Sequence, residues 1–233
     1  MEQFVNGMTL NLPDGTFPLS TDSMVLADFV RLRTDARVLD LGSGGGTLGV
    51  LLCGQDSRCT GTGVDLEEPA HLAALENIRN NNLEHRLHSI CADLRTVNRL
   101  FPVGSFPCCV SNPPYFTGGP ASHMPLARRD DCCSTDALFH SAAAALCYGG
   151  DFYLVHKPER LAQLCSCAVK EGLEPKRLRL VRHREGGSVS LVLLQCRKGA
   201  KPGLQLEELT LHHKDGTPTE DYRRIYHIQE EYL

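Results

Sequence analysis

A glycine-rich turn directly after a short apolar run is the feature that most restricts the fold of this chain. Residues 37–41, RVLDL, have the composition of a buried strand, and Gly42, Gly44, Gly46 and Gly49 follow at once. Glycines at such a turn let the backbone bend sharply and let a ligand approach without a Cβ in the way. A helical pattern follows them, and this order is typical of α/β proteins that bind a ligand at the carboxyl ends of parallel strands.

Strand and helix patterns alternate along most of the chain. Further strands are expected at 60–66, 87–94, 107–115, 151–156, 176–181 and 188–196, and helices at 21–32, 47–52, 69–78, 134–146 and 158–170. Gly149 and Gly150 are expected to end the 134–146 helix. The Gly186-Gly187 link is too short for a helical crossover, so the last two strands are expected to be antiparallel.

These patterns predict an α/β fold with a mostly parallel seven-stranded sheet and an antiparallel last strand, which looks like the Rossmann-like methyltransferase sheet. An N-terminal β-hairpin is expected from strands at 8–12 and 16–19 around a Pro13-Asp14-Gly15 turn. The length of 233 residues predicts a single domain over 1–233. Residues 1–20 are then a hairpin extension and residues 200–233 a C-terminal extension.

Composition argues against several classes of protein. No apolar run approaches the ~20 residues of a membrane span, and the amino terminus lacks a signal peptide, so a cytoplasmic location is expected. The eleven cysteines include no C-x-x-C pair. Reduced, mostly buried thiols and no metal are therefore expected.

Positive charge gathers in one part of the chain, although the net charge is −4. Its densest stretch is 176–184, KRLRLVRHR, five basic residues with no acid. Lys176, Arg177 and Arg179 are the candidates there for contacts with substrate phosphates. The alternative is a solvated strand edge, because cationic side chains also protect such edges from aggregation.

Three acidic residues are expected at successive strand ends. Asp40 comes directly before the glycines, Asp65 ends the second strand and Asp93 follows the third. The glycine spacing also matches the NAD fingerprint, but a carboxylate at position 40 would repel a diphosphate. The pattern D-x-G-x-G-x-G resembles the first motif of class I S-adenosylmethionine-dependent methyltransferases. Asp40 suits the ammonium of that cofactor, Asp65 its ribose hydroxyls and Asp93 its adenine amine.

The tetrapeptide Asn112-Pro113-Pro114-Tyr115 ends the fourth strand, beside the expected cofactor site. The Asn112 side-chain oxygen and the Pro113 carbonyl can accept the two hydrogens of a planar amine and favour the charge it gains on attack. The prolines hold that carbonyl rigidly. Tyr115 can stack on a flat substrate such as a flipped base. The polar loop 117–131 that follows has the length to close over a substrate, or is an inert surface loop.

Over nearly the whole chain the sequence is similar to the bacterial tRNA adenine-N6 methyltransferase family. The segments that carry this resemblance are FPLSTDSMVLADFV, VLDLGSGGGTLGVLL, GVDLEEPAHLAALEN, CADL, VSNPPYF, HKPERLAQL, EPKRLRLV and the closing IY. The resemblance implies S-adenosylmethionine as cofactor, a tRNA substrate and catalysis by residues 112–115, with Phe116 beside the substrate. It implies cofactor contacts from Asp40, Gly42, Gly44, Gly46, Asp65, Asp93 and Leu94, with Thr21 as a further candidate. Many relatives carry glutamate where this chain has Asp65.

Other functions remain open at this point. The NPPY motif is shared with DNA adenine methyltransferases and with protein-glutamine N5-methyltransferases, so it fixes the reaction more firmly than the substrate. Those enzymes usually carry an additional domain, for which this chain has no room. A cofactor-binding RNA module without catalysis is a further alternative, and an NAD oxidoreductase ranks last.

Overall fold

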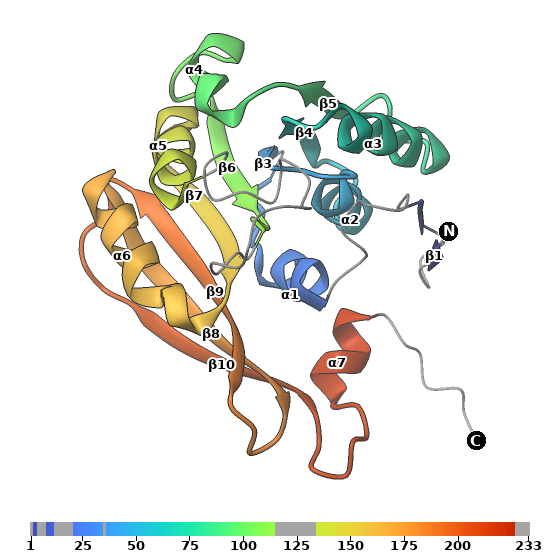
Figure 1. Ribbon diagram of the computed structural model, residues 1–233, viewed down its shortest axis with the longest axis vertical. Helices are drawn as coiled ribbons and strands as arrows, with labels where there is room; N and C mark the ends of the chain where they lie inside the picture. The colour runs from blue at the N-terminus through green and yellow to red at the C-terminus, as the bar shows by residue number, and fades with distance from the viewer. Residues whose placement is uncertain (1, 4–7, 12–20, 35, 115–133, 227–233) are drawn as a thin grey trace, which may run out of the picture.

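The computed structural model describes residues 2–3, 8–11, 21–34, 36–114 and 134–226, and a mixed β-sheet runs through its centre (Figure 1). The sheet has eight strands in the order β10-β8-β9-β7-β6-β3-β4-β5. The strands are β3 (Arg37–Leu41), β4 (Thr60–Asp65), β5 (Leu87–Cys91), β6 (Phe106–Ser111), β7 (Leu146–His156), β8 (Leu173–Arg184), β9 (Val189–Lys198) and β10 (Gln205–His212). All seven pairings within it are parallel except those of β9, which runs antiparallel to both β7 and β8.

Helices cover both faces of this sheet, as Figure 1 shows. One face packs against α1 (Thr21–Phe29), α2 (Thr47–Gln55), α3 (Glu68–Asn80) and α7 (Glu220–Ile225). The other face packs against η1 (Leu94–Thr96), α4 (Val97–Leu100), α5 (Thr135–Ala145) and α6 (Leu161–Lys170), which follows the short turn η3 (Pro158–Arg160). The two apolar cores follow from strands whose side chains alternate between the faces: Val38 packs in the first core, and Leu39 and Leu41 in the second.

The parallel sheet with one antiparallel strand near its end confirms the predicted fold class. The predicted count of seven strands omits β10, which pairs in parallel with β8 and forms the edge of the sheet. Only Leu209 and Leu211 of β10 are buried, so its apolar alternation is too short to predict a strand.

The predicted end of the 134–146 helix is wrong. The helix ends at Ala145, and Gly149 and Gly150 lie inside β7. Gly149 has φ 76°, and the pairing of β7 with β6 shifts register between Leu146 and Asp151, the stretch that contains it. These glycines therefore serve an irregular strand and not a helix cap.

The N-terminal hairpin has a different composition from the predicted one. β2 (Thr9–Leu10) lies within the expected strand 8–12, but it pairs antiparallel with β1 (Glu2–Gln3). The expected turn and second arm at 13–19 lie outside the described residues. Asn77 on α3 and Asn81, which caps the end of α3, hold β2 by hydrogen bonds in both directions with the backbone of Asn11 and Thr9.

Candidate active site

The glycine turn between β3 and α2 borders open space. Gly42, Gly44 and Gly46 have φ of 75°, 53° and 78°, the left-handed region that favours glycine. A Cβ at Gly42 or Gly44 would meet nothing within 4 Å, so the room above these two residues is left for a ligand. Gly49 has a packing role instead, because its Cβ would lie 2.8 Å from the Leu87 side chain.

Hydrogen bonds from two segments fix the shape of this turn. The Val64 carbonyl at the end of β4 accepts from the backbone N–H groups of Gly42 and Ser43, at 2.9 and 3.2 Å. The Asn77 side chain on α3, which is fully buried, donates to the Gly45 carbonyl at 2.9 Å. The turn is thus held in place before any ligand binds.

Asp40 is a buried acid at the end of β3. Both of its carboxylate oxygens, and the Ser43 hydroxyl near it, are buried and have no hydrogen-bond partner in the part of the chain that the structure describes. Burial, with a smaller contribution from the negative charge of Asp65, raises the pKa of Asp40 to about 8. A buried carboxyl without partners costs free energy, which a cationic ligand group would recover.

Asp65 is oriented by the backbone around it. Its Oδ2 accepts from the Gly44 N–H at 2.7 Å and its Oδ1 accepts from the Glu67 N–H at 3.0 Å. A carboxylate has about four lone-pair sites, so each oxygen keeps the capacity to accept from a ligand hydroxyl. The carboxylate therefore links the glycine turn to the end of β4 and is positioned for a diol.

Asp93 and Leu94 follow β5 at the same edge of the sheet. The Asp93 carboxylate caps η1 through the Arg95 N–H and binds the Arg95 guanidinium with both oxygens. These bonds lower the pKa of Asp93. Leu94 is buried in the second core. In this structure Asp93 is thus occupied by a neighbour, and a ligand amine would have to share it with Arg95.

Asn112 directly follows β6, where the chain leaves the sheet. The buried Ser111 hydroxyl donates to the Leu41 carbonyl at 2.7 Å, which joins the end of β6 to the end of β3. The Asn112 Nδ2 donates to the Ser23 hydroxyl on α1 at 3.0 Å. Pro113 is buried and Pro114 half-buried. Tyr115, Phe116 and the loop 117–131 lie outside the described residues.

Thr21 begins α1, the helix that carries Ser23. Its hydroxyl accepts a hydrogen bond at 3.3 Å from the hydroxyl of Tyr226, the residue that follows α7. The structure thus brings the start of α1 and the end of β6 together, and Thr21 contacts the C-terminal part of the chain.

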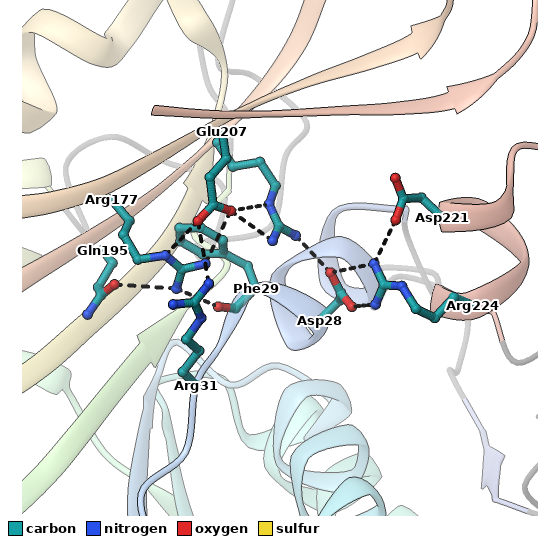
Figure 2. Close-up of polar contacts among 9 residues, drawn as sticks. Asp28, Phe29, Arg31, Arg177, Gln195, Glu207, Asp221 and Arg224 are labelled. Atoms are coloured by element: carbon teal, nitrogen blue, oxygen red, sulfur yellow. Dashed lines mark hydrogen bonds and ion pairs between the residues drawn. The ribbon is translucent and has the colours of Figure 1, made fainter. Parts of the chain in front are cut away.

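The basic stretch 176–184 is not a sheet edge, and Arg177 within it does not face solvent. It lies in β8, between β10 and β9. Arg177 is 4% exposed, and Arg177 and Arg179 both bind Glu207 of β10, as Figure 2 shows for Arg177 and Glu207. Arg179 also binds Asp28 of α1 at 2.7 Å. Lys176 donates to the Lys201 carbonyl and is half-buried.

The burial of the ion pairs explains this difference from the prediction. Arg177 and Arg179 stack over the Phe29 ring, with their guanidinium carbons 4.2 and 5.0 Å from its centroid. An RNA phosphate would have to displace Glu207 or Asp28 to reach them. These two arginines therefore hold β8, β10 and α1 together.

Three residues that support the site have no motif in the sequence: Ser23, Ser43 and Asn77. Asn77 is the one that a sequence pattern could have indicated. It shares a helix face with the buried Ala73 and Ala74, and a polar side chain on such a face is expected to be hydrogen-bonded. Nothing near Ser23 in the sequence indicates a contact with a residue 89 positions away.

The groups at this edge of the sheet fit S-adenosylmethionine. Asp40 offers an unpartnered carboxyl for an ammonium, the glycine turn offers space, and Asp65 offers acceptors for a ribose. Among the described residues, no cluster of three or more His, Cys, Asp or Glu is arranged to hold a metal ion. No helix within the described ranges has the length and apolar character needed to span a membrane.

Of the eleven cysteines, the nine that the structure describes are unbridged. Cys53, Cys59, Cys108, Cys109, Cys167 and Cys196 are buried, Cys147 and Cys165 are half-buried, and Cys91 is exposed. The expectation of mostly buried thiols is confirmed for these nine.

Comparison with known proteins agrees with this geometry. A protein named tRNA1(Val) (adenine(37)-N6)-methyltransferase from Tolumonas auensis is 33% identical over 202 residues, 84% of this chain and 83% of the relative. One of the same name from Vibrio parahaemolyticus is 30% identical, over 90% of this chain and 87% of the relative.

Solved structures show the same fold. A predicted O-methyltransferase from Agrobacterium tumefaciens superposes with a TM-score of 0.76 at 19% identity, over 89% of this chain and 96% of that one. The 16S rRNA N2 G1207 methyltransferase of T. thermophilus, in complex with AdoMet and guanosine, gives 0.60 at 22%, over 84% and 49%. The methyltransferase small domain model matches residues 19–164. With more than half of its length matched and a relative of 33% identity aligned over most of both chains, this chain belongs to the methyltransferase small domain family.

Proposed function

We propose that this protein is an S-adenosylmethionine-dependent methyltransferase that modifies N6 of an adenine in tRNA, beside the anticodon. The similarity to relatives named for this reaction over most of the chain is the observation that carries the proposal. The position of Asn112 beside the acids and glycines of the cofactor edge supports it.

The cofactor supplies a methyl group activated by its sulfonium. In this proposal Asp40 binds the cofactor ammonium, and the turn at Gly42, Gly44 and Gly46 lies against its amino-acid end. Asp65 accepts from the ribose hydroxyls. Asp93 and Leu94 contact the adenine ring, and Thr21 contributes from the start of α1.

Asn112 and the Pro113 carbonyl act on the substrate amine. The nitrogen of an adenine amine is a poor nucleophile because its lone pair is delocalised into the ring. The Asn112 Oδ1 and the Pro113 oxygen accept hydrogen bonds from its two N–H groups. They thereby favour tetrahedral geometry at the nitrogen and stabilise the positive charge that develops on it during attack. Pro114 stiffens the backbone, and Tyr115 and Phe116 are the candidates to stack on the flipped base.

The reaction needs no general base before attack. The amine becomes much more acidic once it carries the methyl group, so its proton leaves to water or to a neighbouring acceptor afterwards. The proposed roles of Asn112 and Pro113 are therefore acceptance of hydrogen bonds and orientation of the amine.

The remaining parts of the proposal concern substrate and context. Lys176 is a candidate for RNA contacts outside the adenine site. We also propose a cytoplasmic location, where tRNA is modified, and one catalytic domain over 1–233 with extensions at 1–20 and 200–233. Protein glutamine is the alternative acceptor, but the named relatives favour adenine.

Radiolabelled methyl transfer tests the proposal directly. Unmodified tRNA, a mixed protein fraction and a DNA fraction are each incubated with labelled cofactor. We expect label in tRNA, as N6-methyladenosine on digestion, and a loss of at least about 100-fold in kcat in Asn112→Ala, the effect typical of one preorganised acceptor. Label in the protein fraction alone would support glutamine methylation, and cofactor binding with no transfer to any fraction would support a non-catalytic module.

A further inference from the structure

Ser23 lies in the first turn of α1 and contacts the residue on which the proposed chemistry depends. Its hydroxyl accepts from Asn112 Nδ2 at 3.0 Å, across 89 positions of sequence. Ser23 is 6% exposed, and Asn112 is half-buried. Water is therefore poorly placed to substitute for the hydroxyl.

The contact matters because the Asn112 carboxamide has two unlike ends. Its oxygen accepts hydrogen bonds and its nitrogen donates them. With Nδ2 bonded to Ser23, Oδ1 is directed to the other side of the amide. A carboxamide turned by half a rotation would present N–H groups to the N–H groups of the substrate, and the interaction would become repulsive.

We propose that Ser23 is a positioning residue that holds the Asn112 carboxamide with its oxygen toward the substrate amine. This inference rests on the proposed function, because it assigns Ser23 a role only through Asn112. Ser23 orients an acceptor and does not itself touch the substrate.

The helix that carries Ser23 is anchored well enough for this role. Asp28, near the end of α1, binds Arg179 of β8 and Arg224 of α7, and Figure 2 shows the Asp28–Arg224 contact. At the other end of α1, Tyr226 donates to Thr21. Contacts at both ends fix the helix along its axis, so the Ser23 hydroxyl is presented at a constant position.

The experiment compares Ser23→Ala with Ser141→Ala, a control serine that is 2% exposed in α5 on the opposite face of the sheet. We expect kcat for tRNA methylation to fall about 3- to 10-fold in Ser23→Ala, the value of one neutral hydrogen bond. The KM for tRNA and the affinity for cofactor should stay within about two-fold, since neither tRNA binding nor cofactor binding depends on the orientation of the Asn112 carboxamide. The control should leave kcat unchanged.

A symmetric side chain at position 112 separates orientation from a merely structural effect. Asn112→Asp has two equivalent acceptor oxygens, so its orientation no longer matters. Addition of Ser23→Ala to Asn112→Asp should therefore change kcat by less than about two-fold, whereas the same change in the wild type gives the full loss. An equal loss of kcat in both backgrounds, or a change in KM with no change in kcat, would overturn the assignment.

Nuclear magnetic resonance tests the contact without reference to activity. In protein labelled with ¹⁵N-asparagine, the side-chain amide pair of Asn112 is identified by its loss in Asn112→Asp. That pair should shift in Ser23→Ala and stay unchanged in Ser141→Ala. An unmoved pair would refute the contact. A moved pair in a protein that methylates no RNA would instead refute the proposed function and leave the contact standing.

Discussion

Replacement of Asp40 by asparagine should stabilise the cofactor-free protein near pH 8 and at the same time weaken its binding of cofactor. The wild-type carboxyl is 4% exposed, its oxygens have no partner among the described residues, and burial raises its pKa from 3.8 to about 8. Between these two values the folded protein holds a proton that the unfolded chain has released. Stability therefore falls as the pH rises through this window, and is constant above it.

The size of the effect follows from the pKa difference. One bound proton gives a slope of up to about 1.4 kcal/mol per pH unit, so the wild type could lose at most about 4 kcal/mol from pH 5 to pH 8. Partial hydration of the folded state reduces this, and we expect about 2–3 kcal/mol. Asp40→Asn has no charge to bury and should lack this loss. The cost of burying its amide does not change with pH.

Urea unfolding followed by far-ultraviolet circular dichroism measures this directly, since the chain has no tryptophan. Asp136→Asn is the control: this exposed acid has a pKa lowered by Lys170, so its contribution is lost only at a pH below this window. Parallel pH profiles of Asp40→Asn and the wild type between pH 5 and 8 would refute the burial argument.

Cofactor binding should reverse the charge state of Asp40. A bound ammonium favours the carboxylate, so binding at pH 7 should release a proton from the wild type and none from Asp40→Asn. Calorimetry in buffers of different ionisation enthalpy counts this proton. Equal proton release in both proteins would show that the cofactor cation does not lie near this carboxyl.

Three further outcomes follow from the structure. Gly44→Ala forces a side chain into φ 53° and into open space beside the proposed cofactor, so it should cost about 1–2 kcal/mol by thermal unfolding and lower cofactor affinity. Glu207→Gln leaves the buried Arg177 guanidinium without its acid partner, whereas Arg179 keeps Asp28, and should cost about 2–4 kcal/mol in urea. The exposed Glu208→Gln should cost less than about 1 kcal/mol, and equal losses would contradict this. Iodoacetamide should label the exposed Cys91 in the native protein and spare Cys109, whose pKa burial raises well above its usual value; mass mapping that finds Cys109 first would refute it.

The parts of the fold with strong local patterns were predictable from the sequence. The parallel strands around the glycine turn, and the antiparallel pair joined by Gly186 and Gly187, follow from apolar runs and turn residues. β10 was not predictable, because its stability comes from pairing with β8 and from the burial of only two leucines. The start of β7 was not predictable, because a glycine in a left-handed conformation such as Gly149 occurs both at helix ends and in irregular strands.

The site shows the same division between local and distant information. A motif locates Asp40, Asp65 and Asn112, because their roles depend on where a strand ends. The sequence around Arg177 shows only positive charge, and its partner Glu207 comes from a strand that the sequence did not predict. Whether a cluster of cations faces solvent or an acid from another segment is decided by tertiary packing, which linear charge patterns do not contain.

The ion pairs of Figure 2 join the C-terminal segment to β8 and to α1, the helix that carries Ser23. α1 starts beside Asn112 and ends at Phe29, beneath the arginines of β8. Glu207 of β10 neutralises those arginines, and Arg224 of α7 binds Asp28. In our proposal, loss of these C-terminal acids and bases would thus free the helix whose first turn orients Asn112. Substitutions in β10 and α7 should therefore lower kcat for methyl transfer in proportion to their loss of stability, even though their side chains lie away from the reacting atoms.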